Sequence, residues 1–232
     1  MPELAGIRRA LVISPHADDE ALACGGTMAR LATQGTEVRV LYMTVDGFHH
    51  YGLDGVTTYQ DRVKEIEAVA DLLRFEWEIV YGDQDLIEKL DTVPKRDLVD
   101  RFERELNEFE PELVVIPSGA DYDQDHVATF DTALAALRPI APVFGKWLVP
   151  HVLIYESPKI MWWHTDMPRP EAFVDISDVL GRKLEALALY ATQARPSPHI
   201  RSAESVTALA CLRGKEIGVE YAEAYKVLRT IW

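Results

Sequence analysis

The sequence predicts an α/β fold: a Rossmann-like, doubly wound and mostly parallel sheet with C-terminal elaborations. In the first half, short apolar segments alternate with longer segments of helical periodicity. Repeated strand–helix units of this kind form a parallel sheet with helices on both faces. Hydrophobic residues make up 48% of the chain and charged residues 27%, which is typical of a globular protein. No linker composition divides the chain, so we expect one domain over residues 1–232.

The first half predicts alternating strands and helices. Gly35 follows the first helix as a C-cap glycine would. Thr57 and Gln60 have capping-box spacing at the start of the second helix, and Pro94 opens the third. The predicted strands cover residues 9–14, 37–44, 76–81 and 113–117, and the predicted helices cover residues 20–34, 57–73 and 92–108.

The second half predicts a fifth strand and further helices. The strand is the apolar segment HVLIY at residues 151–155. The tail, residues 221–228, fits the periodicity of a strand and of a helix, so its secondary structure is left undecided between the two. The helices are expected at residues 124–137, after Ser177 as the N-cap, and at residues 202–213 with Gly214 at the end.

Acidic residues dominate the charge of the chain. Lys and Arg number 24 and Asp and Glu 38, which gives a net charge of −14. A surface of this sign repels phosphate backbones and anionic lipid heads, so it argues against nucleic-acid binding and stable membrane association. A small-molecule ligand fits the composition better.

The cysteine content and the N-terminus predict a cytoplasmic protein. Cys24 and Cys211 are too few for a disulfide framework, and we expect both to be buried in a reducing compartment. The first residues lack the basic-then-apolar order of a signal peptide. No apolar stretch reaches the ~18 residues that a membrane span needs. The oligomeric state stays open, with a homo-oligomer as one option.

Reactive side chains follow the first and fourth predicted strands. Open α/β sheets bind ligands beyond the carboxyl ends of their strands, where the strand order reverses, and in the order 3-2-1-4-5 these two strands meet there. Residues 15–20, PHADDE, follow the first strand, and residues 118–126, SGADYDQDH, follow the fourth. We therefore expect His126 to lie beside His16 and the pair of aspartates at 18 and 19.

Two imidazoles and one carboxylate form the ligand set of a catalytic zinc, which keeps its fourth position open. A further carboxylate beside the metal can act as general base on water. The plainer interpretation is an acidic first helical turn with an incidental histidine, because the helix dipole stabilises carboxylates there.

Two other sites fit the sequence less well. Residues 121–125 have the spacing of a calcium loop, but its sixth position is His126 instead of Gly and its twelfth is Thr132 instead of Glu. No Gly-x-Gly-x-x-Gly motif supports a dinucleotide site. Gly25 and Gly26 more simply allow close packing of the first helix.

At these two motifs the sequence resembles the N-acetylglucosaminyl-phosphatidylinositol de-N-acetylase family (PIG-L, also called LmbE-like). The family pattern is Pro-His-Pro-Asp-Asp-Glu followed later by His-x-Asp-His, and residues 15–20 and 123–126 (DQDH) are similar to it. Weaker similarities occur at Arg62-x-x-Glu65, at residues 183–187 with Gln193, and at residues 221–225.

The resemblance implies a zinc-dependent deacetylase that acts on N-acetylated sugars. It implies His16, Asp19 and His126 as zinc ligands and Asp18 as the general base. Nitrogen and oxygen ligands also suit Fe²⁺ or another divalent ion. Asp125, next to a ligand, is expected to orient an imidazole N–H.

The chain departs from the family pattern at two positions. Ala17 replaces the usual proline, which should only loosen the turn. Asp123 replaces the first histidine of the second motif, which in the family is thought to act as an acid or to stabilise the oxyanion. An ionised carboxylate can do neither, which leaves two alternatives: Asp18 moves the proton both ways, or Asp123 binds an imidazole or a sugar hydroxyl. Arg62 is expected either to contact substrate or to form a surface ion pair with Glu65.

Two loops on the ligand side are candidates for the pocket wall. Residues 46–52 follow the second strand, and their His49 and His50 are more simply exposed than metal-binding. Residues 162–164, WWH, either stack on a sugar or fill the core. The alternatives to a deacetylase are an amidase on another N-acyl glycoside or thiol conjugate, and a non-catalytic module that binds a metal or a sugar. We expect a soluble sugar-containing metabolite as the substrate, because an acidic surface disfavours an anionic bilayer.

Overall fold

A computed structural model describes residues 6–45, 47, 57–82, 84–140, 142–158 and 169–231. Within these residues one sheet has the strand order β3-β2-β1-β4-β5-β7-β6. The strands are β1 (Arg9–Ser14), β2 (Glu37–Val45), β3 (Glu76–Gly82), β4 (Leu113–Ile116), β5 (His151–Tyr155), β6 (Ala172–Asp175) and β7 (Ala222–Arg229). The helices are α1 (Asp19–Thr33), α2 (Tyr59–Leu73), α3 (Lys95–Phe109), α4 (Gln124–Ala136), α5 (Leu180–Leu189) and α6 (Ala203–Ile217), with short 3₁₀ turns η1 (Leu90–Thr92) and η2 (Pro142–Phe144).

The sheet confirms the predicted order of the first five strands. β3, β2, β1, β4 and β5 run parallel to their neighbours, whereas β7 pairs antiparallel with both β5 and β6. The order reverses between β1 and β4, which pair directly with Ala10 opposite Leu113. The loops that leave these two strands therefore start side by side at one edge of the sheet.

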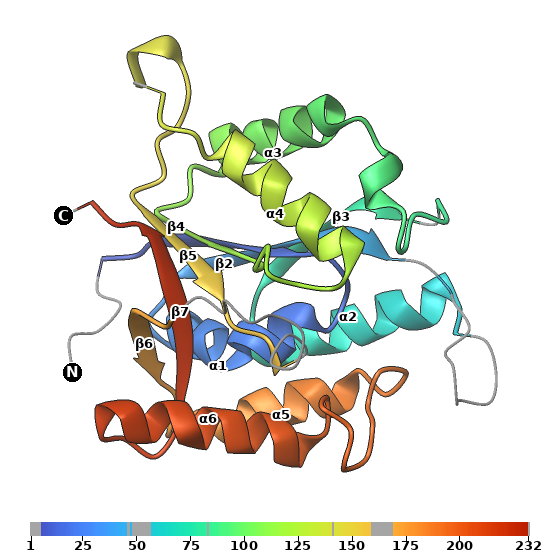
Figure 1. The fold of residues 1–232 in the computed structure, drawn as a ribbon, viewed down its shortest axis with the longest axis vertical. Helices are drawn as coiled ribbons and strands as arrows, with labels where there is room; N and C mark the ends of the chain where they lie inside the picture. Colours follow the sequence, from blue (N-terminus) through green and yellow to red (C-terminus); the bar gives the residue numbers. More distant parts are fainter. Residues whose placement is uncertain are drawn as a thin grey trace.

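Helices cover both faces of the sheet (Figure 1). Successive residues of β1 point to opposite faces, so Ala10 and Val12 belong to one apolar cluster and Leu11 and Ile13 to the other. The first cluster includes buried residues of α1, α2, α5 and α6, and the second includes buried residues of α3 and α4. Both faces are thus buried, which explains the continuous apolar run of this strand.

The tail is strand β7, and the preceding helix is longer than predicted. The prediction that this helix ends at Gly214 is wrong, because α6 continues to Ile217 and ends at Gly218 with φ +79°. A Cβ on Gly214 would lie 2.6 Å from the carbonyl oxygen of Glu220. Gly214 therefore lets the returning chain pass against the helix and enter the sheet.

Smaller corrections concern caps and burial. The capping box joins Thr58 and Asp61, one residue later than predicted, because α2 begins at Tyr59. Ser177 does not cap α5; it lies in the preceding turn and its hydroxyl donates to Asp175. Cys24 is buried as predicted, whereas Cys211 is half-buried because α6 packs through only one side.

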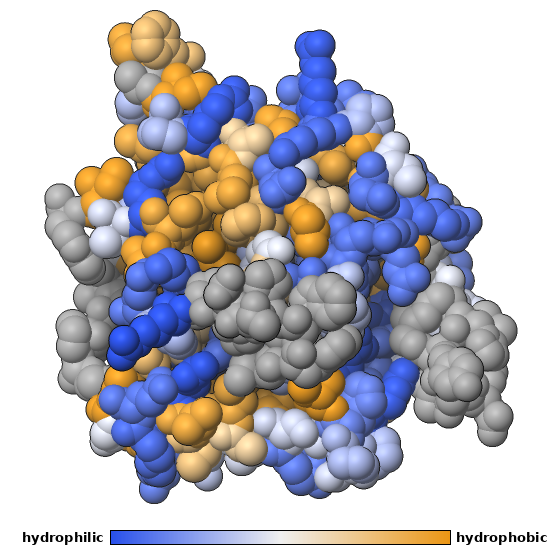
Figure 2. All heavy atoms as spheres, viewed as in Figure 1, coloured by the Kyte–Doolittle hydropathy of each residue, from blue (hydrophilic) through white to orange (hydrophobic). Residues whose placement is uncertain are grey.

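One apolar segment projects from the body. η2 lies on the extension between α4 and β5 at the top of Figure 1, and hydrophobic residues colour this tip orange in Figure 2. Val143 and Phe144 are 85% and 78% exposed there. Among the described residues, no helix has both the length and the apolar character to cross a membrane.

Candidate active site

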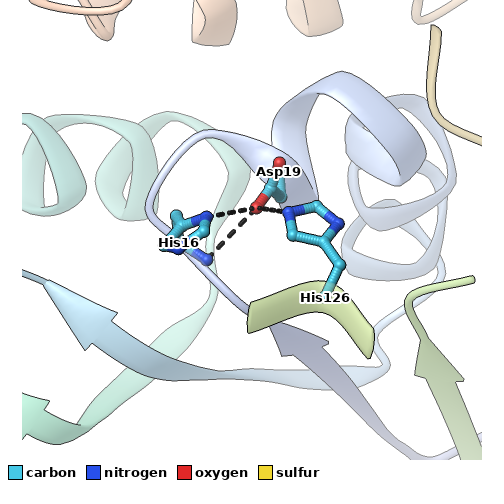
Figure 3. A group of neighbouring side chains, drawn as sticks. All are labelled: His16, Asp19 and His126. Atoms are coloured by element: carbon cyan, nitrogen blue, oxygen red, sulfur yellow. Dashed lines mark hydrogen bonds and ion pairs between the residues drawn. The ribbon is translucent and has the colours of Figure 1, made fainter. Parts of the chain in front are cut away.

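The loops after β1 and β4 bring two histidines and an aspartate together (Figure 3). His16 and Asp19 come from the β1–α1 loop and the start of α1, and His126 from the first turn of α4. His126 Nε2 lies 3.0 Å from Asp19 Oδ2, and His16 Nδ1 lies 3.4 Å from the same oxygen. One nitrogen of each ring and one carboxylate oxygen all lie within 4.8 Å of one another, so this group could hold a metal ion.

The loop that carries these residues has a strained backbone at Asp18, where φ is 111° and ψ is −24°. A residue with a side chain rarely adopts a positive φ, and such strain persists where the surroundings enforce it. Glu20 Oε2 accepts the Asp18 N–H at 3.2 Å, and Arg62 donates to the carbonyl oxygen of Ala17. These contacts hold Asp18 and Asp19 on the same tight turn.

Glu20 is part of a buried polar network beneath this turn. Tyr190 donates its hydroxyl hydrogen to Glu20 Oε1 at 2.6 Å, and the Tyr42 and Tyr190 oxygens are 3.1 Å apart. Burial, reinforced by the charge of Asp18, raises the pKa of Glu20 to about 7. Tyr190 is fully buried.

A second carboxylate stands behind each imidazole. Asp125 Oδ2 lies 2.9 Å from His16 Nε2, and Asp121 Oδ2 lies 2.9 Å from His126 Nδ1. Each carboxylate can fix its imidazole with a hydrogen on the far nitrogen, which leaves the nitrogen near Asp19 free to be a ligand. Sequence analysis missed Asp121 in this role; its only signal was its place in the acidic loop after β4.

The donor set fits a divalent cation. Burial lowers the pKa of His16, but hydrogen bonds with Asp125 and Asp19 and the charges of Asp123 and Asp19 outweigh it and raise this pKa to about 10. The carboxylates thus stabilise a positive charge at this point, and a metal ion can supply it in place of the proton. Two imidazoles and one carboxylate without cysteine are typical of a catalytic rather than a structural zinc site.

Asp123 caps α4 and also faces the site. Its side chain accepts the Asp125 N–H at 3.0 Å, and its Oδ2 lies 4.0 Å from His126 Nε2. With His16 and Asp125 it forms a second group of donors that could hold a metal ion. The cap explains why an aspartate suits this position structurally.

Arg62 lies under the loop rather than on the surface. Its ion pair with Glu65 forms, with 2.6 Å between Nη1 and Oε2, but both residues are buried, so the expected surface pair is wrong in location. Arg62 also donates to Thr192 Oγ1 at 2.8 Å. A substrate contact for Arg62 stays a prediction.

Arg201 is a residue that sequence analysis missed. Its Nη1 lies 3.2 Å from Asp18 Oδ2 and donates to Gln193 Oε1 at 2.8 Å. Arg201 precedes α6, more than 180 residues after Asp18, and no motif signalled it. The predicted loop residues His49, His50 and 162–164 lie outside the described residues.

Comparison with known proteins places this arrangement in a family. The family model described as GlcNAc-PI de-N-acetylase (PIG-L) matches residues 11–137, more than half of the chain. The chain belongs to the PIG-L family. The match confirms the resemblance noted in the sequence, and it spans both motifs of the site.

Relatives of this PIG-L protein differ in what their names describe. The uncharacterized deacetylase YaiS of Escherichia coli K12 is 29% identical over 168 residues, which are 68% of this chain and 78% of YaiS. The N,N'-diacetylchitobiose deacetylase of Pyrococcus horikoshii has a TM-score of 0.73 at 24% identity, over 96% of this chain and 84% of that one. The 4-carboxy-2-hydroxymuconate hydratase GalB of Pseudomonas putida KT2440 has a TM-score of 0.75 at 24% identity, over 97% of this chain and 98% of GalB. The same fold thus occurs in a deacetylase and in a hydratase, so the activity of this chain has to be argued from its site.

Proposed function

We propose that this protein is a zinc-dependent hydrolase that removes the acetyl group from an N-acetylated amino sugar or glycoside. The observation that carries the proposal is the group of His16, Asp19 and His126 with Asp18 on the same tight turn. Membership of a family named for de-N-acetylation and a relative named as a deacetylase support it.

Three side chains would hold the zinc: His16 through Nδ1, His126 through Nε2 and Asp19 through Oδ2. Asp125 and Asp121 support them by fixing the two imidazoles from behind. When bound, zinc supplies Lewis-acid chemistry to water and to the amide carbonyl. Fe²⁺ is the alternative ion, since these ligands suit both.

Asp18 is the proposed general base and general acid. In the reaction it accepts a proton from the attacking water and then gives that proton to the departing amine, while the carbonyl carbon leaves as acetate. The Arg201 guanidinium holds Asp18 Oδ2 through a charge-assisted contact and so orients the carboxylate. Asp123 has no proton to donate when ionised, so this scheme leaves both transfers to Asp18.

The test is acetate release from N-acetyl glycosides together with measured zinc content. We expect Asp18→Ala to keep its zinc and to lose activity about 10²- to 10⁴-fold, because it lacks the proton carrier. His126→Ala should lose both zinc and activity. Asp100→Ala, which removes an exposed carboxylate on α3, is the matched control and should change neither. Full activity in Asp18→Ala or His126→Ala would refute the scheme.

One observation favours a second candidate, a module that binds a metal or sugar without turnover. Asp123 stands where the family pattern has a histidine, so an acid group of the reaction is replaced. Zinc binding without hydrolysis of any N-acyl glycoside or thiol conjugate would favour this candidate. A soluble small-molecule substrate in the cytoplasm remains our proposal under either function, since the net charge of −14 disfavours an anionic bilayer.

A further inference from the structure

The peptide group between Ala17 and Asp18 is held from both sides. Its carbonyl oxygen accepts a hydrogen bond from Arg62 Nη2, and its N–H donates to Glu20 Oε2 at 3.2 Å. The C=O and N–H of a trans peptide point in opposite directions, so these two side chains together fix the orientation of the whole peptide plane. Both side chains are buried, and each therefore depends on further polar partners to stay in place.

One segment of the chain supplies those partners. Tyr190, at the end of α5, donates its hydroxyl hydrogen to Glu20 Oε1 at 2.6 Å. Thr192 Oγ1 accepts from Arg62 Nη1 at 2.8 Å and donates at 2.7 Å to Glu65 Oε2, which also pairs with Arg62. α5 lies against α1 and α2, the helices that carry Glu20 and Arg62, so the chain that leaves α5 reaches both side chains that hold the peptide (Figure 1).

The backbone held in this way is strained. φ of Asp18 is 111°, in a region that residues with a side chain rarely adopt, and such strain persists only where the surroundings enforce it. Rotation about this bond sets the direction of the Asp18 side chain relative to His16, which precedes it in the loop. His16 and Asp19 would be held by the zinc in the loaded enzyme. Asp18, between them, is then the residue whose direction depends on the hydrogen bonds to the peptide.

We infer that Tyr190 and Thr192 are positioning residues that keep Asp18 directed at the amide of the substrate. The inference rests on the proposed function, in which Asp18 carries the proton. Tyr190 is fully buried and acts through Glu20, whereas Thr192 acts through Arg62. Two hydroxyl groups on the segment after α5 thus maintain the strained conformation on which the proton transfers depend.

The test is a double-mutant cycle at saturating zinc, with the methyl glycoside of N-acetylglucosamine as substrate. Tyr190→Phe removes the hydroxyl and keeps the ring. We expect it to lower kcat about 10- to 100-fold, the loss of a hydrogen bond to a charged group, with KM and zinc content unchanged. In Asp18→Asn, which has no carboxylate to carry the proton, the same change should cost nothing further, because Tyr190 acts through Asp18. A residue that only supports the fold would lower the rate by the same factor in both backgrounds.

Tyr225→Phe is the matched control. Tyr225 is buried in the same apolar cluster as Tyr190, and its hydroxyl likewise donates to a buried glutamate, Glu223, at 3.1 Å. That glutamate accepts the main-chain N–H groups of Gly26 and Thr27 instead of that of Asp18. The control should therefore keep the wild-type kcat. An unchanged kcat in Tyr190→Phe, or an equal loss in Tyr225→Phe or in the Asp18→Asn background, would overturn the inference.

Thr192→Val tests the other side of the peptide. Residue 192 is only half-buried, so this change disturbs the core less than one at Tyr190. It should lower kcat in the same direction, and only while Asp18 is present, because Arg62 loses the hydroxyl that holds it. A wild-type kcat in Thr192→Val would contradict the role inferred for this residue.

Crystal structures provide a measurement that does not need turnover. We expect φ of Asp18 to be positive in the wild type and to move into the negative region in Tyr190→Phe, with the hydrogen bond between the Asp18 N–H and Glu20 broken. That difference supports the inference even where no glycoside is hydrolysed, a result that would refute only the proposed function. An Asp18 backbone that is the same in both structures would refute the positioning role.

Discussion

A buried ion pair between Lys183 and Glu223 joins the C-terminal part of the chain to the helix that begins at the site. Lys183 Nζ on α5 lies 2.5 Å from Glu223 Oε1 on β7, and both side chains are less than 5% exposed. Glu223 also accepts the main-chain N–H groups of Gly26 and Thr27 on α1, at 2.9 and 2.7 Å. One carboxylate therefore fixes α1, α5 and β7 together.

Lys183→Met is the informative perturbation, because it removes the cation and keeps most of the side-chain volume. Glu223 would remain buried with its hydrogen-bond donors but without its counter-charge. Breaking a buried ion pair in this way costs about 3–5 kcal/mol. For a chain of this size about 1 kcal/mol corresponds to roughly 2–4 °C in Tm, so we expect Tm to fall by roughly 6–20 °C.

Lys226→Met is the matched control. Lys226 lies on the same strand as Glu223 and pairs with Glu171, but those two side chains are 37% and 43% exposed. An exposed pair contributes about 0–1 kcal/mol, so the control should lose only a few degrees at most. Circular dichroism gives the Tm of both variants by thermal unfolding and their free energies of unfolding by urea titration. A loss below about 1 kcal/mol in Lys183→Met, or equal losses in the two variants, would refute the reasoning.

Three further predictions concern α1 and the site. Gly26→Ala should destabilise the fold by about 1–3 kcal/mol, because the new Cβ would lie 2.7 Å from Ile176 Cγ2. Gly181→Ala is the control: its Cβ would enter open space, so it should stabilise the fold by about 0.5–1 kcal/mol. Thermal unfolding that ranks the two variants the other way would contradict the packing argument. Asp121→Asn should weaken zinc binding about 10- to 100-fold in a competition titration with a chelating dye, because His126 loses its orienting carboxylate; unchanged affinity would remove Asp121 from the site. The free energy of unfolding of the metal-free protein should fall as pH rises from 4.5 to about 7, because Glu20 keeps its proton in the folded protein at pH values where the unfolded chain has released it. Glu20→Gln should flatten this part of the plot of unfolding free energy against pH. An identical slope in the variant would argue against a proton on Glu20.

Much of the fold could be predicted because its signals are local. The strand at residues 9–14 is apolar from Ala10 to Ile13 because both its faces are buried, and α-helical periodicity follows from one-sided packing. The rule that parallel strands present their carboxyl ends at one edge then predicts that His16 and His126 approach each other, and their rings lie with centroids 5.5 Å apart.

What sequence patterns could not predict are contacts between side chains whose spacing in the chain carries no information about distance. Asp121 is one of several acids in its loop, and only the direction of the loop aims it at His126 Nδ1. Lys183 and Glu223 belong to two separate weak motifs in the sequence. They meet only in the folded protein, where β7 lies between β5 and β6. Arg201 contacts Asp18 because the segment after α5 folds back over the start of α1. Strand and helix periodicity does not predict where such a connecting segment packs. Local periodicity is set by which side of an element is buried, whereas the partners of a buried charge are set by packing across the whole chain.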